Sequence, residues 1–165
     1  RDRERLERMT AFVRAHADCF ERALAEGHIT GSAWIVDPSR RQTLLAHHRK
    51  LGKWLQPGGH ADGDPDPLRV ALREAREETG LVGLRVVQEA IFDVDIHEIP
   101  ARGDTPAHLH YDVRYLLEAD PAEPPAVSVE SHAVAWRPLA EVAAEGEESL
   151  ARMARKSLRV SRGKE

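Results

Sequence analysis

Apolar and polar residues alternate with two different periods along the chain, and each change of period marks a predicted element. Over residues 1 to about 26 the apolar positions recur at helical spacing among charged residues, which predicts an amphipathic helix that stops near Gly27. These positions are Leu6, Met9, Val13, Phe20 and Leu24. From Ile29 the residues become β-branched and aromatic, which predicts a change from helix to strand.

The β-like segments form two groups. Residues 29–37 and 42–48 flank a turn at Asp37-Pro38-Ser39 and predict a hairpin. Residues 91–99 and 108–117 alternate apolar and polar side chains and are expected to pair as antiparallel strands. The rest of the pattern predicts a strand around 132–137 and helices near 139–144 and 147–159.

This order of helix, strands, helix, strands and helix predicts a mixed α/β fold with a largely antiparallel or mixed sheet between helices. We expect residues 1–165 to form one domain. A net charge of −4 and the lack of an apolar run of about 18 residues argue against a nucleic-acid or membrane binder. The single cysteine, Cys19, excludes an internal disulfide and suits a reducing cytoplasm.

The most informative stretch is residues 57–81, PGGHADGDPDPLRVALREAREETGL. A Pro-Gly-Gly turn and an acidic loop lead into a predicted helix. Asp66 is expected to be the N-cap and Pro67 the first helical residue, where its missing N–H costs nothing. Gly80 is expected to end the helix in a left-handed conformation.

Glu74, Glu77 and Glu78 are spaced i, i+3 and i+4, so they share one helical face beside the apolar face. Three like charges at this spacing repel one another, which favours a divalent cation between them. Hard oxygen ligands suit Mg²⁺, with Mn²⁺ as an alternative. Arg73 lies four residues before Glu77 and is expected to pair with it across one turn.

The sequence resembles a known family at these residues. Residues 59–81 are similar to the Nudix box, commonly written G-x5-E-x7-R-E-U-x-E-E-x-G-U, where U is a bulky apolar residue. Gly59 matches the first glycine, and residues 73–81 match the second half at every specified position, with Ala75 as the first U. The box glutamate expected six residues after Gly59 is replaced by Pro65, and Asp64 or Asp66 could substitute for it.

The resemblance implies a Nudix-like α/β/α sandwich and hydrolysis of a nucleoside diphosphate linked to another moiety, such as a nucleotide, ADP-ribose or a nucleotide sugar. It implies metal ligation by Glu74, Glu77, Glu78 and the Gly59 carbonyl. It also implies that Arg73 orients the carboxylates and that Glu130, just before the last strand, is a base or a metal ligand. The expected catalytic residues are therefore Arg73, Glu77 and Glu130.

Substrate contacts are less constrained. The basic loop 48–54 could be a solvated connection, or Arg49, Lys50 or Lys53 could contact an anionic substrate. His60 follows the glycine pair directly and is the histidine expected to approach substrate. The partner is a small nucleotide, and the sequence leaves a homodimer open.

The remaining histidines allow several interpretations. His108, His110 and Asp112 share one strand face, and Asp95 and His97 share another. They could line a cleft, lie on a solvated sheet face, or hold zinc through His108, His110 and Asp112.

Two other functions remain alternatives. A Nudix domain could sense a nucleotide without cleaving it, although the intact carboxylates favour an enzyme. An isoprenoid diphosphate isomerase shares the fold but needs a well-placed cysteine, and Cys19 lies in the predicted first helix.

Overall fold

The computed structural model describes residues 1–162. Its elements, in chain order, are α1 (Asp2–Ala15), β1 (Gly27–Val36), β2 (Gln42–His48), β3 (Lys53–Leu55), β4 (Gly58–His60), α2 (Pro67–Thr79), β5 (Arg85–Val86), β6 (Asp93–Ile99), β7 (His108–Glu118), β8 (Ser131–Pro138), α3 (Leu139–Glu145) and α4 (Glu148–Arg162). None of these helices is both long enough and apolar enough to cross a membrane.

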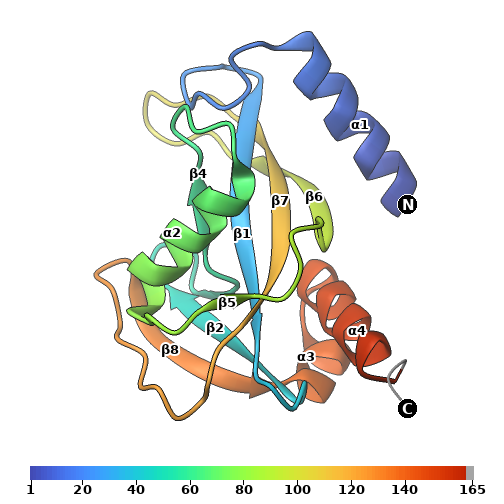
Figure 1. The fold of residues 1–165 in the computed structure, drawn as a ribbon. Coiled ribbons are helices and arrows are strands. Elements are labelled where there is room, and N and C mark those ends of the chain that lie inside the picture. The colour runs from blue at the N-terminus through green and yellow to red at the C-terminus, as the bar shows by residue number, and fades with distance from the viewer. Residues whose placement is uncertain (163–165) are drawn as a thin grey trace.

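The strands form one mixed sheet with β1 at its centre (Figure 1). β1 runs parallel to β7 along its whole length, from Gly27 opposite Leu109 to Val36 opposite Glu118. It is antiparallel to β2 and β4, and β6 pairs antiparallel with β7 as predicted. This arrangement confirms a mixed, largely antiparallel sheet.

Helices cover both faces of the sheet, which gives the expected α/β/α layers. One core contains Ile29 and Ile35 of β1 with Ala71 and Ala75 of α2, and it also contains residues of α1. The neighbouring position in β1, Trp34, points to the other face, where its indole Nε1–H donates to Ser157 of α4 at 2.8 Å. Because successive strand residues face opposite sides, β1 connects two separate cores.

Both predicted ends of α2 are confirmed. The Asp66 carboxylate accepts hydrogen bonds from the backbone N–H groups of Leu68 and Arg69, and Pro67 occupies the first turn. Gly80 ends the helix with φ +68° and donates its N–H to the Arg76 carbonyl. A glycine takes this left-handed conformation without Cβ strain, so α2 stops at a defined residue beside the sheet.

The first helix is shorter than predicted, since it ends at Ala15 and not near residue 26. His16 is extended, and turns follow up to β1. The Cys19 carbonyl accepts the Ile29 N–H, and the Phe20 carbonyl accepts the Gly63 N–H. Backbone groups that would have continued the helix therefore pair with β1 and the acidic loop. Phe20 and Leu24 still pack against the core, which explains why their spacing looked helical.

A buried ionic network joins α4 to β6 and β7. Arg114 is only 2% exposed, and its guanidinium contacts the carboxylates of Asp93, Asp95 and Asp112. Arg152 of α4 bonds to Asp93 at 2.7 Å and to Asp95 at 3.0 Å. This network fixes the strands that carry several of the histidines described below.

Candidate active site

Two glutamates of α2 lie directly against the glycine pair of β4. A Cβ atom added to Gly59 would lie 2.6 Å from the carboxyl carbon of Glu74. The backbone N–H of Gly58 donates to Glu78 Oε2 at 2.9 Å. Glu74 and Glu78 are half-buried, whereas Glu77 is exposed. The glycines therefore let a strand backbone approach a carboxylate face, as the close spacing of the motif requires.

The charged forms of Glu74 and Glu78 are disfavoured where these side chains lie, so the pKa of each is raised. Burial, and next the charge of Glu77, raises the pKa of Glu74. Burial raises the pKa of Glu78 to about 8, with further contributions from Glu74, Glu130 and Glu77, while the Gly58 N–H lowers it. Grouped acids whose ionised forms are this unfavourable suit a bound cation, which would neutralise them.

Arg73 is placed differently from the sequence prediction. Its Nη2 donates to the His60 carbonyl at 2.8 Å and lies 3.5 Å from Glu74 Oε1. No ion pair joins it to Glu77 within residues 1–162. The expected i, i+4 pairing is therefore wrong, because the guanidinium turns toward β4. From there it links β4 to the carboxylate face.

Glu130 and Arg49 meet at the start of β8. The Arg49 backbone N–H donates to the Glu130 carbonyl at 3.0 Å, and its guanidinium Nε donates to the Ser131 carbonyl at 3.2 Å. The Glu130 charge raises the pKa of both Glu74 and Glu78, so this acid lies within electrostatic range of them. The structure thus places Glu130 within electrostatic range of Glu74 and Glu78, and Arg49 beside the Glu130 backbone.

Lys53 and His60 have different surroundings. Lys53 forms an ion pair with Glu147, just before α4, at 2.8 Å, and both side chains are more than half exposed. It lines a hollow with Leu45 and Leu150, residues of the core on the α4 side. The structure therefore does not bring Lys53 to the carboxylates. His60 follows Gly59 directly, but its ring packs against His28 and His110.

In the acidic loop, Pro65 stands where the box has a glutamate, and the three aspartates of this loop all bond to other groups of the protein. Asp64 forms a bidentate salt bridge with Arg69, with hydrogen bonds of 2.7 and 2.6 Å. Asp66 caps α2. Asp62 pairs with Arg22 through bonds of 3.0 and 2.9 Å. These contacts hold the loop in place. They do not indicate that Asp64 or Asp66 takes over the role of the glutamate replaced by Pro65.

The donor set fits a hard divalent cation. Carboxylate oxygens of Glu74 and Glu78 converge where the glycine backbone leaves no side chain, and Glu77 lies on the same helical face. Mg²⁺ takes a few carboxylates and keeps several waters or substrate oxygens, which this half-open arrangement allows.

A group of histidines forms on the sheet face opposite α2. His28 of β1 is 3% exposed and lies in register with His110 of β7. One nitrogen each from His28, His108 and His110 lie within 4.8 Å of one another. Asp112 is not part of the group, because it accepts hydrogen bonds from Thr30, Ser32 and Arg114. Of the interpretations left open for these side chains, zinc binding that includes Asp112 is therefore not favoured.

The sequence missed His28 because the strand was expected to begin at Ile29, whereas β1 begins at Gly27. Its signal was the alternation of polar residues in HITGS, where His28, Thr30 and Ser32 share one face. Only the parallel pairing of β1 with β7 places this face beside His110.

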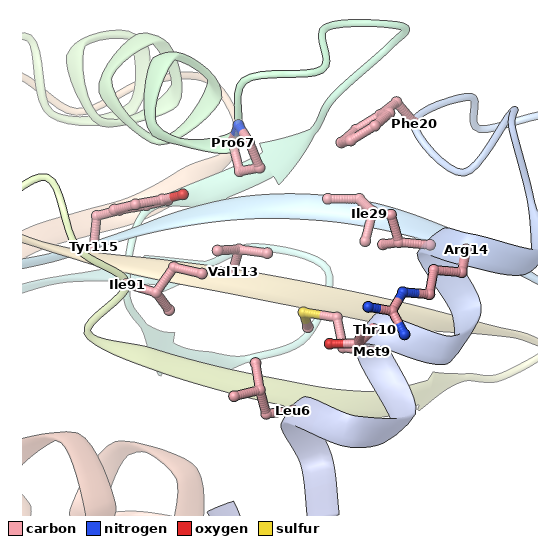
Figure 2. Close-up of a pocket in the computed structure, with 11 residues that line it drawn as sticks. Leu6, Met9, Thr10, Arg14, Phe20, Ile29, Pro67, Ile91, Val113 and Tyr115 are labelled. Atoms are coloured by element: carbon pink, nitrogen blue, oxygen red, sulfur yellow. The ribbon is translucent and has the colours of Figure 1, made fainter. Parts of the chain in front are cut away.

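A separate apolar cavity of about 360 Å³ lies between α1 and the sheet (Figure 2). Figure 2 shows Met9 and Leu6 of α1 pointing toward Val113 and Ile29 of the sheet. None of the predicted site residues lines it.

Curated proteins share part of this sequence. The chain is 37% identical over 82 residues to a probable DHNTP pyrophosphohydrolase of Lactococcus lactis subsp. cremoris, covering 48% of each chain. It is 34% identical over 121 residues to a CMP-5'-(N-acetyl-N-hydroxy-3-aminopropyl)phosphonate hydrolase of Streptomyces rubellomurinus, covering 68% of this chain and 53% of that protein. The chain thus spans about half the length of these curated relatives.

Solved structures share the fold. A C. elegans Ap4A hydrolase superposes with a TM-score of 0.65 at 18% identity, covering 82% of this chain and 98% of that one. The family model for the NUDIX domain matches residues 28–157, which include nearly all of β1, the glycine pair, α2 and Glu130. Since this match covers most of the chain, the protein belongs to the Nudix family.

Proposed function

We propose that this protein hydrolyses a pyrophosphate bond in a nucleoside diphosphate linked to another moiety, and that it requires Mg²⁺. The observation that carries the proposal is the convergence of the Glu74 and Glu78 carboxylates on the Gly58–Gly59 backbone, with Glu130 in electrostatic range. Membership of the Nudix family and relatives named as pyrophosphohydrolases support it.

Glu74, Glu77, Glu78 and the Gly59 carbonyl would hold the cation. Bound there, Mg²⁺ would neutralise charge on the pyrophosphate and stabilise the leaving phosphate. Arg73 positions this set, because its bond to the His60 carbonyl fixes β4 while its guanidinium rests against Glu74.

Glu130 is proposed as the general base that takes the proton from the attacking water. It is exposed and unencumbered by a side-chain ion pair in the described residues, and it lies beside the carboxylate face. Arg49 is held next to it by the bond to the Ser131 carbonyl, so its charge is available to a substrate phosphate.

The other predicted substrate contacts are weaker. His60 follows Gly59 in β4, but its ring faces His28 and His110, so a substrate contact would require the ring to turn away from them. Lys53 would reach substrate only by leaving Glu147. The substrate classes that we propose are nucleotides, ADP-ribose and nucleotide sugars; the relatives' names mention DHNTP and a CMP-linked phosphonate.

The test is a phosphate-release screen with Mg²⁺ over ADP-ribose, nucleoside triphosphates, dinucleoside polyphosphates and nucleotide sugars. Turnover by the wild type, its loss in Glu77→Gln and its retention in Glu98→Gln, an exposed acid of β6, would support the proposal. No turnover of any substrate, or equal turnover by Glu77→Gln, would overturn it. Tight binding of an uncleaved nucleotide would instead favour a sensing domain. Sedimentation would decide whether the protein forms the homodimer that the sequence leaves open.

A further inference from the structure

Five imidazoles form a row across the sheet on the face opposite α2. His60 of β4 lies opposite Thr30 of β1, and its ring is 5.1 Å from that of His28. His28 is in register with His110 of β7, which is in turn paired with His97 of β6. His108 is two residues from His110 on the same face, with ring centroids 5.2 Å apart. The row thus depends on strand pairing and not on a local motif.

The buried nitrogens of this row have no partners. Both ring nitrogens of His28 and the Nε2 of His110 are buried and make no hydrogen bond in the described structure. A buried polar atom without a partner costs roughly 1–3 kcal/mol, so such atoms usually have a role beyond packing. One nitrogen of His28 and one of His110 also belong to the group of three imidazole nitrogens that gather at this point of the sheet, so these unpaired atoms are available to a ligand.

Two outer contacts orient the rings at either end. His108 Nδ1 lies 2.9 Å from the Pro106 carbonyl. If Nδ1 donates its proton to this carbonyl, the lone pair of Nε2 can bind a metal. His97 Nδ1 lies 3.2 Å from the Asp95 carboxylate. Metal-binding histidines commonly donate their other N–H to a carbonyl or carboxylate, which fixes the tautomer and the ring plane.

Two of these rings have lowered pKa values because they are buried. Burial, and next the neighbouring His60, lowers the pKa of His28 to about 4. Burial, and next His28, lowers the pKa of His110 to about 2.

We propose that His28, His108 and His110 form a second metal site, which binds a borderline transition-metal dication of the Zn²⁺ class. The three ligand atoms lie within 4.8 Å of one another, whereas a tetrahedral site with Zn–N bonds of about 2.0 Å needs roughly 3.3 Å between them. Small side-chain rotations close this difference. His60 or a water completes the coordination, since the His60 ring is 5.1 Å from both His28 and His110.

This site is distinct from the carboxylate face. Gly59 faces Glu74 on the α2 side of β4, and the next residue, His60, faces the histidine row. Imidazole nitrogens select Zn²⁺, Co²⁺, Ni²⁺ or Cu²⁺, whereas the carboxylates select Mg²⁺ or Mn²⁺. The two sites therefore bind different ions on opposite faces of one short strand.

The test is titration of the wild-type protein with Co²⁺ and with Zn²⁺ while excess Mg²⁺ masks the carboxylates. We expect one equivalent to bind, with the strong visible absorption of tetrahedral Co²⁺, and the melting temperature to rise with metal concentration. Zn²⁺ should displace the Co²⁺ signal. No binding, or an octahedral Co²⁺ spectrum, would overturn the proposal whatever the variants show.

The variants locate the ion. His108→Gln, at the half-buried start of β7, and His110→Gln should weaken binding by at least about tenfold, because even outer contacts change metal affinity by that factor. His16→Gln, outside the row, and Glu74→Gln should leave it unchanged. Loss of binding in Glu74→Gln, or full binding in His108→Gln with the wild-type circular dichroism spectrum, would show that the ion lies elsewhere.

Discussion

Gly59 lies so close to the carboxylate of Glu74 that a Cβ atom added to it would be 2.6 Å from the carboxyl carbon. We therefore expect Gly59→Ala to lower kcat about a hundredfold, because a displacement of about 1 Å at a catalytic group costs that much. Glu74 is at the edge of the packed core, so the fold should persist. Steady-state kinetics and a thermal melt check both statements.

Gly52→Ala is the matched control. No atom lies within 4 Å of a Cβ at Gly52, but its φ is +62°. We expect it to lose about 1 kcal/mol of stability from the left-handed conformation and to retain full turnover. Gly59 does not have a positive φ, so equal kcat loss in both variants would mean that a general loss of stability, and not the contact with Glu74, lowers turnover.

Arg73→Lys tests the link between β4 and the carboxylate face. Lysine carries the charge but cannot donate to the His60 carbonyl and remain beside Glu74 with a planar fork. We expect kcat to fall about tenfold to a hundredfold with little change in KM. Arg69→Lys, which affects the pairs of Arg69 with Asp64 and Asp66 in the acidic loop, should behave as wild type in the same assay.

Substitutions of Arg49 and of Lys53 should have different effects on KM. Arg49 lies beside Glu130, whereas Lys53 pairs with Glu147. We expect Arg49→Gln to raise KM about tenfold, as lost contact with a phosphate would, and Lys53→Gln to leave it unchanged. A KM increase in Lys53→Gln alone would show that the ion pair with Glu147 opens to admit substrate.

Arg114→Met should be among the most destabilising single changes. The side chain is 2% exposed and contacts three buried or half-buried carboxylates, which would be left without compensation. Breaking a buried pair by removing one partner costs about 3–5 kcal/mol. Urea unfolding measures this loss. Arg85→Met, which removes an exposed partner of Glu118, should cost less than about 1 kcal/mol.

The ionisation of Asp93 should determine how the free energy of unfolding changes at low pH. Burial alone would raise its pKa, but hydrogen bonds from Arg152 and Lys156 and the charge of Arg114 outweigh burial and lower it. A carboxyl with a depressed pKa contributes stability above its unfolded value of about 3.9, and this is lost as pH falls through the folded value. We expect the free energy of unfolding to drop below about pH 4.

Arg152→Met should move that acid transition to higher pH, because it removes two of the hydrogen bonds to Asp93. Arg155→Met is the control, because Arg155 lies on the same helix but contacts exposed Glu148 and the Ala143 carbonyl and not Asp93. Coincident acid transitions in all three proteins, followed by circular dichroism, would show that Asp93 does not set the response.

The predictable parts of the molecule are those governed by neighbours in sequence. The caps of α2 at Asp66 and Gly80 follow from hydrogen bonding and backbone conformation within a few residues. The carboxylate face follows from helical spacing alone. Alternation along residues 108–117 was enough to predict β7 and its pairing with β6.

The rest depends on contacts between distant segments. The helix predicted to residue 26 stops at Ala15 because the Cys19 and Phe20 carbonyls pair with β1 and the acidic loop. Arg73 turns from Glu77 to the His60 carbonyl, a partner that helical spacing cannot reveal. His28 joins the histidine row only through the parallel ladder with β7.

That ladder has a kinetic consequence. Thr30 and Asp112, joined by a hydrogen bond across β1 and β7, are 82 residues apart in the chain. Contacts of such high sequence separation form slowly, since a long loop must close before they contribute. The Nudix box is complete well before β7 in the chain, yet α2 packs on a surface that β1 and β7 build together. A nascent chain ending before β7 therefore carries every box residue and still has no platform on which to assemble them.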